Sequence, residues 1–388
     1  MKYISEELKK IKESGLYREL RVVGNAQDTH IEIEGKTFLS FCSNNYLGLA
    51  NNPSVIKAVK DAVEEYGWGA GASRLVSGNM TLHETLENEI SRFKGKEATL
   101  VFPTGYMANL GTISSLVSNG DLVICDKLNH ASIIDGCRLS GADLRVYAHC
   151  DMEKLENILR KSSKYNRKLI VTDSVFSMDG DLAPLPDIVK IAGKHKAMVM
   201  VDEAHGTGVF GKNGGGVVEH FNLNREVDIV MGTLSKAIGS LGGYVTGDID
   251  LINYLKNKAR TFMYTTALPP AVCAASIAGI KLIQEEPSLR VSLWHNVRFI
   301  KDKLESLNFN VISSESPIIP ILIGDAQKAV DVSKLLYKRG IVIPAIRPPT
   351  IPANSSRLRM TVMSTHTKED LDSLLDALSD VQGLSPLP

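Results

Sequence analysis

The sequence has little that would direct the protein to a membrane, to nucleic acid or to secretion. No apolar run approaches the ~18 residues of a membrane-spanning helix. Lys and Arg together number 44, as do Asp and Glu, so the zero net charge indicates no electrostatic attraction to nucleic acid or anionic lipid. The N-terminal stretch MKYISEELKKIKESG lacks the apolar segment of a signal peptide. We therefore expect a cytoplasmic protein that binds neither a membrane nor nucleic acid.

Cysteine is also scarce, and its positions exclude two common uses. There are five cysteines, an odd number, and none of them forms a CxxC pair or a metal-ligand spacing. We expect reduced, mostly buried thiols and no bound metal. The cysteines are Cys42, Cys125, Cys137, Cys150 and Cys273.

Short apolar segments alternate with amphipathic helical patterns through the middle of the chain. These segments are apolar almost throughout, which is typical of strands buried on both faces of a mostly parallel sheet. With helices between them, they predict a layered α/β domain. The expected strands cover residues 98–103, 121–126, 168–173, 197–202 and 228–233.

The C-terminal part has a different pattern and predicts a smaller α+β lobe. Its expected helices cover 292–309, 329–340 and 368–381, and its expected strands cover 317–324 and 357–363. We expect three regions: an N-terminal helix and segment packed on the small lobe, a large domain, and the small lobe itself. Their expected limits are 1–44, 45–284 and 285–388.

The stretch VDEAHGTGVFGKN (201–213) contains two nucleotide-binding patterns at once. Gly206, Gly208 and Gly211 spell G-x-G-x-x-G, and Gly206 with Gly211 and Lys212 spells most of a P-loop. The segment KNGGG that follows Gly211 cannot continue as the helix that a dinucleotide fold requires. The hydroxyl that would hold Mg²⁺ in a P-loop is missing, because that position is an asparagine. We expect a tight loop that binds no nucleotide.

Two residues at neighbouring strand ends are more informative. Asp202 ends one expected strand and Lys236 follows another, and ligands of open α/β sheets bind outside the carboxyl ends of the strands. A lysine that forms a Schiff base and an aspartate that pairs with a pyridinium nitrogen are the residues that hold pyridoxal phosphate. Either residue alone could be a solvated lysine or a loop cap, but their joint placement favours this cofactor.

Nine motifs, in order along nearly the whole chain, resemble those of the α-oxoamine synthases. These are pyridoxal phosphate enzymes of fold type I, homodimers with an aspartate aminotransferase-like fold, which join an amino acid to an acyl-CoA. The motifs are FCSNNYLGLA (41–50), GAGASRLVSGNMTLHETLE (69–87), FPTGYMANLG (102–111), DKLNHASIIDGCRLS (126–140), TDSVFSMDGDLAPLPDI (172–188), VDEAHGTGVFG (201–211), GTLSKAIGSLGG (232–243), RTFMYTTALPP (260–270) and IRPPTIPANSSRLRMTVM (346–363).

The resemblance implies catalytic roles for four residues. Lys236 would form the Schiff base and later accept the substrate Cα proton, and Asp202 would pair with the pyridine nitrogen. His130 would stack on the cofactor ring, and His205, together with Ser177, would lie near its phenolic oxygen. Without the resemblance, either histidine could be a hydrogen-bonded core side chain.

The resemblance also implies how the phosphate is bound. The backbone amides of Gly105 and Tyr106 would face it from a helix N-terminus, and Thr233 would add a hydroxyl. Thr265 or Thr266 would reach the phosphate of the partner subunit, so that two chains share each site.

For the substrates, Arg359 matches the arginine that binds the α-carboxylate. Arg357 is expected on the same strand face, so only the motif distinguishes the two. Asn45 is either a further polar contact or a turn residue. Arg21 would grip the acyl donor, with Arg18 as the alternative.

The finer substrate assignment depends on one segment. Arg347 and Thr350, in IRPPT, resemble members that join L-alanine to pimeloyl-CoA, or to a pimeloyl carrier protein, for biotin synthesis. Members that join glycine to acetyl-CoA remain the alternative, as does an enzyme that accepts both pairs.

Overall fold

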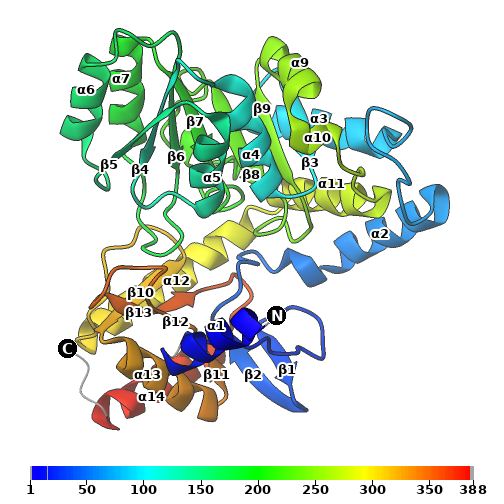
Figure 1. Cartoon of the computed structure of the whole chain (residues 1–388). Coiled ribbons are helices and arrows are strands. Elements are labelled where there is room, and N and C mark those ends of the chain that lie inside the picture. The colour runs from blue at the N-terminus through cyan, green and yellow to red at the C-terminus, as the bar shows by residue number, and fades with distance from the viewer. Residues whose placement is uncertain (1, 15, 385–388) are drawn as a thin grey trace.

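The computed structural model describes residues 2–14 and 16–384 and is built around one seven-stranded sheet (Figure 1). The strand order is β3-β9-β8-β7-β6-β4-β5; the β4–β5, β4–β6, β6–β7 and β7–β8 pairings are parallel, whereas β9 runs antiparallel to β8 and β3. The mostly parallel α/β sheet is thus confirmed, and each of the five expected strands appears within one residue of its expected ends. The strands are β3 (Ala98–Phe102), β4 (Leu122–Asp126), β5 (Asp143–Tyr147), β6 (Lys168–Asp173), β7 (Met198–Asp202), β8 (Ile229–Thr233) and β9 (Gly243–Gly247).

Helices cover both faces of the sheet, which explains why its strands carry apolar side chains in succession. Val123 and Val171 point to one face, where they pack with α4, α5, α9 and α10, whereas Ile124 and Ile170 point to the other and pack with α3, α6, α7 and α11. The helices are α3 (Thr81–Lys94), α4 (Gly105–Leu116), α5 (Ala131–Ser140), α6 (Met152–Arg160), α7 (Leu185–His195), α9 (Ile249–Lys258), α10 (Arg260–Met263) and α11 (Pro270–Glu285).

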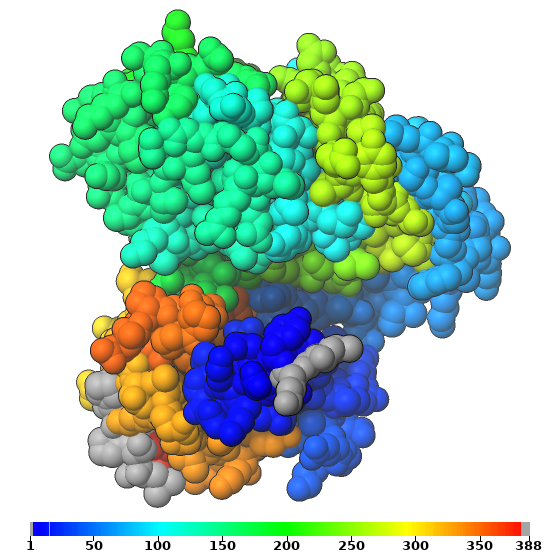
Figure 2. Space-filling model, viewed as in Figure 1, coloured from blue at the N-terminus to red at the C-terminus, as the bar shows by residue number. Residues whose placement is uncertain are grey.

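Both ends of the chain contribute to the second lobe (Figures 1 and 2). β2 from the N-terminal segment pairs in parallel with β11 from the C-terminal part, and β13 lies between β10 and β12 in a second sheet. The elements are α1 (Lys2–Glu13), β1 (His30–Ile33), β2 (Lys36–Ser40), α12 (Ser288–Ser306), β10 (Ile318–Gly324), α13 (Ala326–Lys338), β11 (Ile341–Val342), β12 (Ala345–Ile346), β13 (Ser356–Thr361) and α14 (Lys368–Leu384).

Two connections join the lobes. η1 (Leu49–Asn51) and α2 (Pro53–Tyr66) lead into the large domain, where α2 packs on α11, and α12 leads out of it. None of the described helices is both long enough and apolar enough to cross a bilayer.

The glycine-rich loop after β7 is wound around a buried carboxylate. Glu203 accepts hydrogen bonds from the N–H groups of Val217 and Val218, at 3.0 and 2.7 Å, at the start of the four-residue helix α8 (Val217–His220). The protein's own carboxylate therefore satisfies the amides at the start of the helix that follows the two motifs. Gly208, Gly211, Gly214 and Gly216 all have positive φ, which explains the glycines without a ligand.

Candidate active site

The carboxyl ends of the central strands bring together most of the residues that the motifs single out. Asp173 and Asp202 are aligned in register at the ends of β6 and β7, and Lys236 follows β8. His130 follows β4 and directly precedes α5. This edge of the sheet is where an open α/β fold binds its ligand.

Lys236 is half-buried, and its surroundings favour a neutral amine. Burial lowers the pKa of Lys236, against the attraction of Asp202 and Asp173, and Arg359 lowers it further. A neutral amine is the form that acts as a nucleophile or accepts a proton.

Asp202 is buried, and each of its oxygens accepts a hydrogen bond. The side-chain amide of Asn109 donates to Oδ2 at 2.8 Å, and the N–H of Ala204 donates to Oδ1 at 2.9 Å. Asn109 also donates to Ser132 Oγ at 2.8 Å, and Ser132 lies 2.8 Å from His130 Nδ1. A continuous series of hydrogen bonds through Asn109 and Ser132 thus links Asp202 to His130.

Asp173 is a second buried carboxyl group that sequence reasoning missed. The N–H of His130 donates to it at 2.8 Å, so it fixes the start of α5. Burial and the neighbouring charge of Asp202 raise the pKa of Asp173 well above its usual range. The sequence does contain a signal for Asp173, because this aspartate ends the expected strand KLIVTD just as Asp202 ends AMVMVD.

His205 is buried against Tyr46, another residue that was not predicted. The Tyr46 hydroxyl lies 2.7 Å from His205 Nδ1. Burial raises the pKa of Tyr46 to about 12, and burial with the nearby Lys236 lowers that of His205 far below its usual value. A neutral His205 therefore shares a buried hydrogen bond with the Tyr46 hydroxyl, which also donates to Asn44 Oδ1 at 3.4 Å.

The start of α4 supplies two backbone N–H groups for which the described residues provide no hydrogen-bond acceptor. The first hydrogen bond of the helix is donated by the N–H of Ala108, and the Thr104 hydroxyl accepts the N–H of Met107 at 3.1 Å. The N–H groups of Gly105 and Tyr106 come before these two and take part in neither bond. A Cβ on Gly105 would lie 3.1 Å from Met231 Cε and 3.5 Å from Thr233 Cβ, which explains the glycine. The Thr233 hydroxyl itself donates to the C=O of Gly242 at 2.8 Å and neighbours Ser235 at 2.6 Å.

The structure separates the two arginines of β13. Arg357 forms an ion pair with Asp179. Arg359 donates to the backbone oxygen of Ser177 and, at 3.4 Å, to Asn44, and its charge acts on Lys236 and His205. Arg359 is therefore the one of the two whose charge acts on Lys236.

Asn45 is a turn residue, and only one of its two side-chain polar groups is hydrogen-bonded within the described residues. Its side-chain oxygen accepts the N–H of Ala50 at 3.1 Å, whereas its buried Nδ2 has no partner among the described residues. An unpaired buried amide is costly unless a ligand satisfies it.

The remaining predicted residues lie around a cavity of about 560 Å³ between the N-terminal segment and the small lobe. Arg18, Arg21, Arg347 and Thr350 all line it. Its wall includes Pro344, whose backbone oxygen accepts the N–H of Arg359 at 3.0 Å, so this cavity lies one strand away from that arginine.

Thr265 and Thr266 lie beside Pro103, which precedes α4. The N–H of Ala267, directly after them, donates to the C=O of Ala72 at 3.0 Å. This segment is thus fixed against the 69–87 motif.

The residues present fit pyridoxal phosphate. The start of α4 offers amides to an anion, Asp202 a carboxylate to a ring nitrogen, and Lys236 an amine to an aldehyde. The exposed ring of His130 offers a flat face beside them.

Comparison with known proteins agrees with this arrangement. The 8-amino-7-oxononanoate synthase of Thermoanaerobacter pseudethanolicus is 49% identical over 98% of this chain and 96% of its own. A high-resolution structure of serine palmitoyltransferase with pyridoxal phosphate as an internal aldimine superposes with a TM-score of 0.94 at 34% identity, covering 98% of this chain and 97% of that one. The 8-amino-7-oxononanoate synthase of Francisella tularensis gives 0.78 at 30% identity, covering 89% and 98%.

These values also show that overall shape does not separate the named activities, because the palmitoyltransferase superposes better than the oxononanoate synthase. The model of the aminotransferase class I and II family matches residues 36–378. The fold, the arrangement of the strand-end residues and this match lead to one conclusion: the chain belongs to the aminotransferase class I and II family.

Proposed function

We propose that the protein condenses L-alanine with pimeloyl-CoA, or with a pimeloyl carrier protein, to give 8-amino-7-oxononanoate, CO₂ and the free thiol carrier. The observation that carries this proposal is the 49% identity to an 8-amino-7-oxononanoate synthase over 98% of the chain. The product belongs to biotin synthesis, and five unpaired cysteines are in keeping with a cytoplasmic enzyme.

Pyridoxal phosphate, when bound, supplies a protonated ring that accepts the electron pair left on the substrate Cα. Lys236 would hold the cofactor through its amine and, as a neutral base, would accept the Cα proton of L-alanine. Asp202, oriented by Asn109, keeps the ring nitrogen protonated.

The two histidines orient the ring. His205 would lie near the phenolic oxygen, with Tyr46 holding the imidazole at Nδ1. His130 stacks on the ring face, held by Ser132. The backbone N–H groups of Gly105 and Tyr106 donate hydrogen bonds to the phosphate. The Thr233 hydroxyl donates a further one when it no longer donates to the C=O of Gly242.

The substrates take the remaining groups. Arg359 binds the carboxylate of L-alanine with a guanidinium fork, and the free amide of Asn45 faces the same space. The acyl donor lies in the cavity of Arg21 and Thr350, where Arg18 and Arg347 add positive charge for its anionic groups. No metal takes part in this scheme.

We further propose that the enzyme is a homodimer with shared active sites. Exposed apolar side chains gather next to Thr265 and Thr266: Tyr264 is 70% exposed, and Leu75 and Val76 are 55% and 81% exposed. The bond from Ala267 to Ala72 holds these two segments together. Apolar exposure of this kind indicates an interface.

The decisive experiment compares two substrate pairs on one preparation. We expect a higher kcat/KM for L-alanine with pimeloyl-CoA than for glycine with acetyl-CoA, measured as CoA release. A preference for glycine and acetyl-CoA would instead identify a glycine C-acetyltransferase. No CoA release with either pair, but amino transfer to pyruvate, would identify an aminotransferase.

A further inference from the structure

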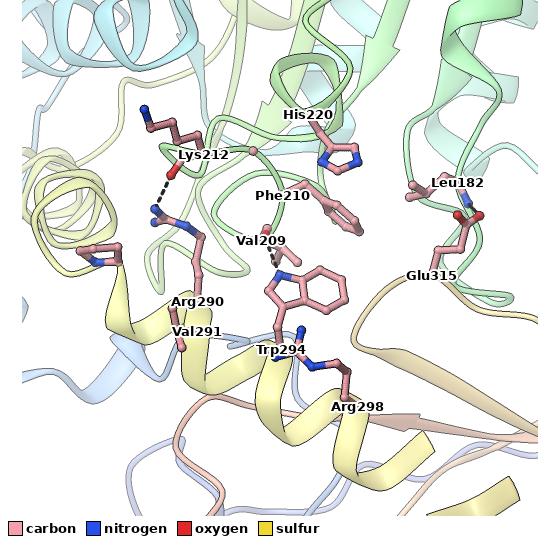
Figure 3. Close-up of a pocket in the computed structure, with 12 residues that line it drawn as sticks. Leu182, Val209, Phe210, Lys212, His220, Arg290, Val291, Trp294, Arg298 and Glu315 are labelled. Carbon is pink, nitrogen blue, oxygen red and sulfur yellow. Dashed lines mark hydrogen bonds between the residues drawn. The ribbon is translucent and has the colours of Figure 1, made fainter. Parts of the chain in front are cut away.

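A second cavity, of about 580 Å³, lies on the other side of the glycine-rich loop, between the large domain and α12 (Figure 3). Val209, Phe210 and Lys212 line it from the loop, and Trp294 and Arg298 from α12. None of the residues assigned above to the cofactor or substrates lines it. Its volume is in the range of small-molecule sites, roughly 300–1,000 Å³.

Aromatic rings form its walls. The rings of Phe210 and Trp294 are 5.2 Å apart at 72°, and those of Phe210 and His220 are 5.9 Å apart at the same angle. The indole N–H already donates to the C=O of Val209 at 3.1 Å, so Trp294 offers a ligand only its ring surface. Such walls favour a planar ligand ring.

One cation beside these rings is unpaired. Arg298 is exposed and has no ion pair or hydrogen bond among the described residues. Arg290 is different: it is buried and donates to the backbone oxygens of Ile283 and Lys212, so it anchors the loop to α12. In Figure 3 the amine of Lys212 points away from the rings.

The single carboxylate of the cavity lies on its far side. Glu315 accepts the N–H of Leu182 at 3.4 Å, across the cavity from Arg290 (Figure 3). Trp294 and Arg298 on α12 nevertheless give the cavity an aromatic and a cationic group, a combination that recognises an aromatic anion.

We propose that this cavity is a second ligand site, which takes a planar aromatic molecule bearing a carboxylate or another anionic group. The ring lies against the side of the cavity formed by Phe210 and Trp294, and the anion pairs with Arg298. This is a proposal about binding, so it is independent of the reaction proposed above.

The cavity contains a built-in reporter, because Trp68 and Trp294 are the two tryptophans of the chain. The holoenzyme with Trp68→Phe, whose exposed side chain is remote in sequence from the cavity, leaves Trp294 as the sole tryptophan. The probe is 4-nitrobenzoate, a planar anion that quenches indole emission on contact, and its uncharged counterpart is 4-nitrobenzyl alcohol.

We expect saturable quenching by 4-nitrobenzoate with one molecule per chain, and about tenfold weaker binding of the alcohol. Arg298→Glu should weaken binding of the anion by about tenfold or more, whereas Arg225→Glu, a matched reversal of an exposed arginine outside the cavity, should change it by less than about twofold. Saturating L-alanine should leave the titration unchanged.

Three results would overturn the proposal: quenching that does not saturate, equal effects of the two charge reversals, or displacement of the probe by L-alanine. The last would place the probe in the catalytic site. Circular dichroism of both variants separates loss of binding from loss of fold.

Discussion

Asp202 is held by two donors, and its charge and its orientation can be separated by mutation. Asp202→Asn keeps the size of the side chain but no longer pairs as an anion with the ring nitrogen. We expect this variant to bind pyridoxal phosphate, seen by its absorbance, but to lose about a hundredfold or more in kcat. Near-normal turnover would contradict the electron-sink role of this pair.

His149 joins two loops that carry site residues. Its Nδ1 lies 3.0 Å from Asp126, next to the loop of His130, and its Nε2 lies 2.7 Å from Asp181, in the loop of Ser177. Burial opposes its charge, but the hydrogen bonds that the ring donates to both carboxylates outweigh that and raise the pKa of His149 to about 12.

This raised pKa predicts a pH dependence of stability. A charged His149 stabilises the fold fully below the pKa of about 6.5 that histidine has when unfolded, and the contribution falls as pH rises from there toward about 12. We expect His149→Gln to lower the melting temperature by several degrees at pH 6 and by less at pH 9. A difference that grew with pH would contradict this assignment.

The motifs marked the residues that we assign to ligand contacts, whereas the residues that hold these in place were not marked. Asn109 contacts Asp202 across 93 positions of sequence, and Tyr46 contacts His205 across 159. Such pairs depend on strand order, which a single sequence does not show. Strand alternation likewise left Arg357 and Arg359 equivalent, and the physical difference between them is the Asp179 carboxylate beside the first.

The glycine-rich loop is the element where a local pattern was most ambiguous. Gly216 has a φ of 114°, and a Cβ there would come within 2.4 Å of Glu203 Oε2. Both effects act against any side chain.

This element predicts a contrast between two glycine replacements. Gly216→Ala should lower the free energy of unfolding by about 1–3 kcal/mol, because of its φ and the collision with Glu203. Gly193→Ala, in the exposed part of α7 with nothing within 4 Å, should leave stability unchanged or raise it by up to about 1 kcal/mol. Denaturant unfolding measures both, and equal stabilities would exclude a strained loop.

Prediction of elements succeeded where side chains were uniformly apolar. The core strands β6 and β7 were predicted because both faces are covered. β5 and β9 were missed: β5 ends the sheet with exposed Arg145 and Val146, and β9 begins and ends with glycine. Edge exposure and glycine both remove the apolar signal, although the pairing is as regular as elsewhere.

For the molecule as a whole, shared sites make a test that no single variant provides. A Lys236→Ala chain lacks the Schiff-base lysine, and a chain with Thr265→Ala and Thr266→Ala lacks the proposed donors to the partner's phosphate. Each should be inactive or nearly so alone. If sites are shared, a mixed dimer contains one intact site, so activity should return on mixing.

Tagged chains establish that subunits have exchanged before activity is measured. Exchange without recovery would assign the threonines to their own chain. Recovery equal to about one site per mixed dimer is the expected result.

The position of β3 has a consequence for the order of events during synthesis. β3 lies at the edge of the sheet, and its one strand neighbour is β9, which is made more than a hundred residues later. The start of α4, directly after β3, is also packed against Gly243 at the beginning of β9. A nascent chain that ends before Gly247 therefore lacks the strand that positions the amides proposed to bind the phosphate, even when it already carries Asp202 and Lys236. We therefore expect cofactor binding to follow completion of the large domain. A free chain truncated between Lys236 and β9 should bind pyridoxal phosphate weakly, although it contains Lys236.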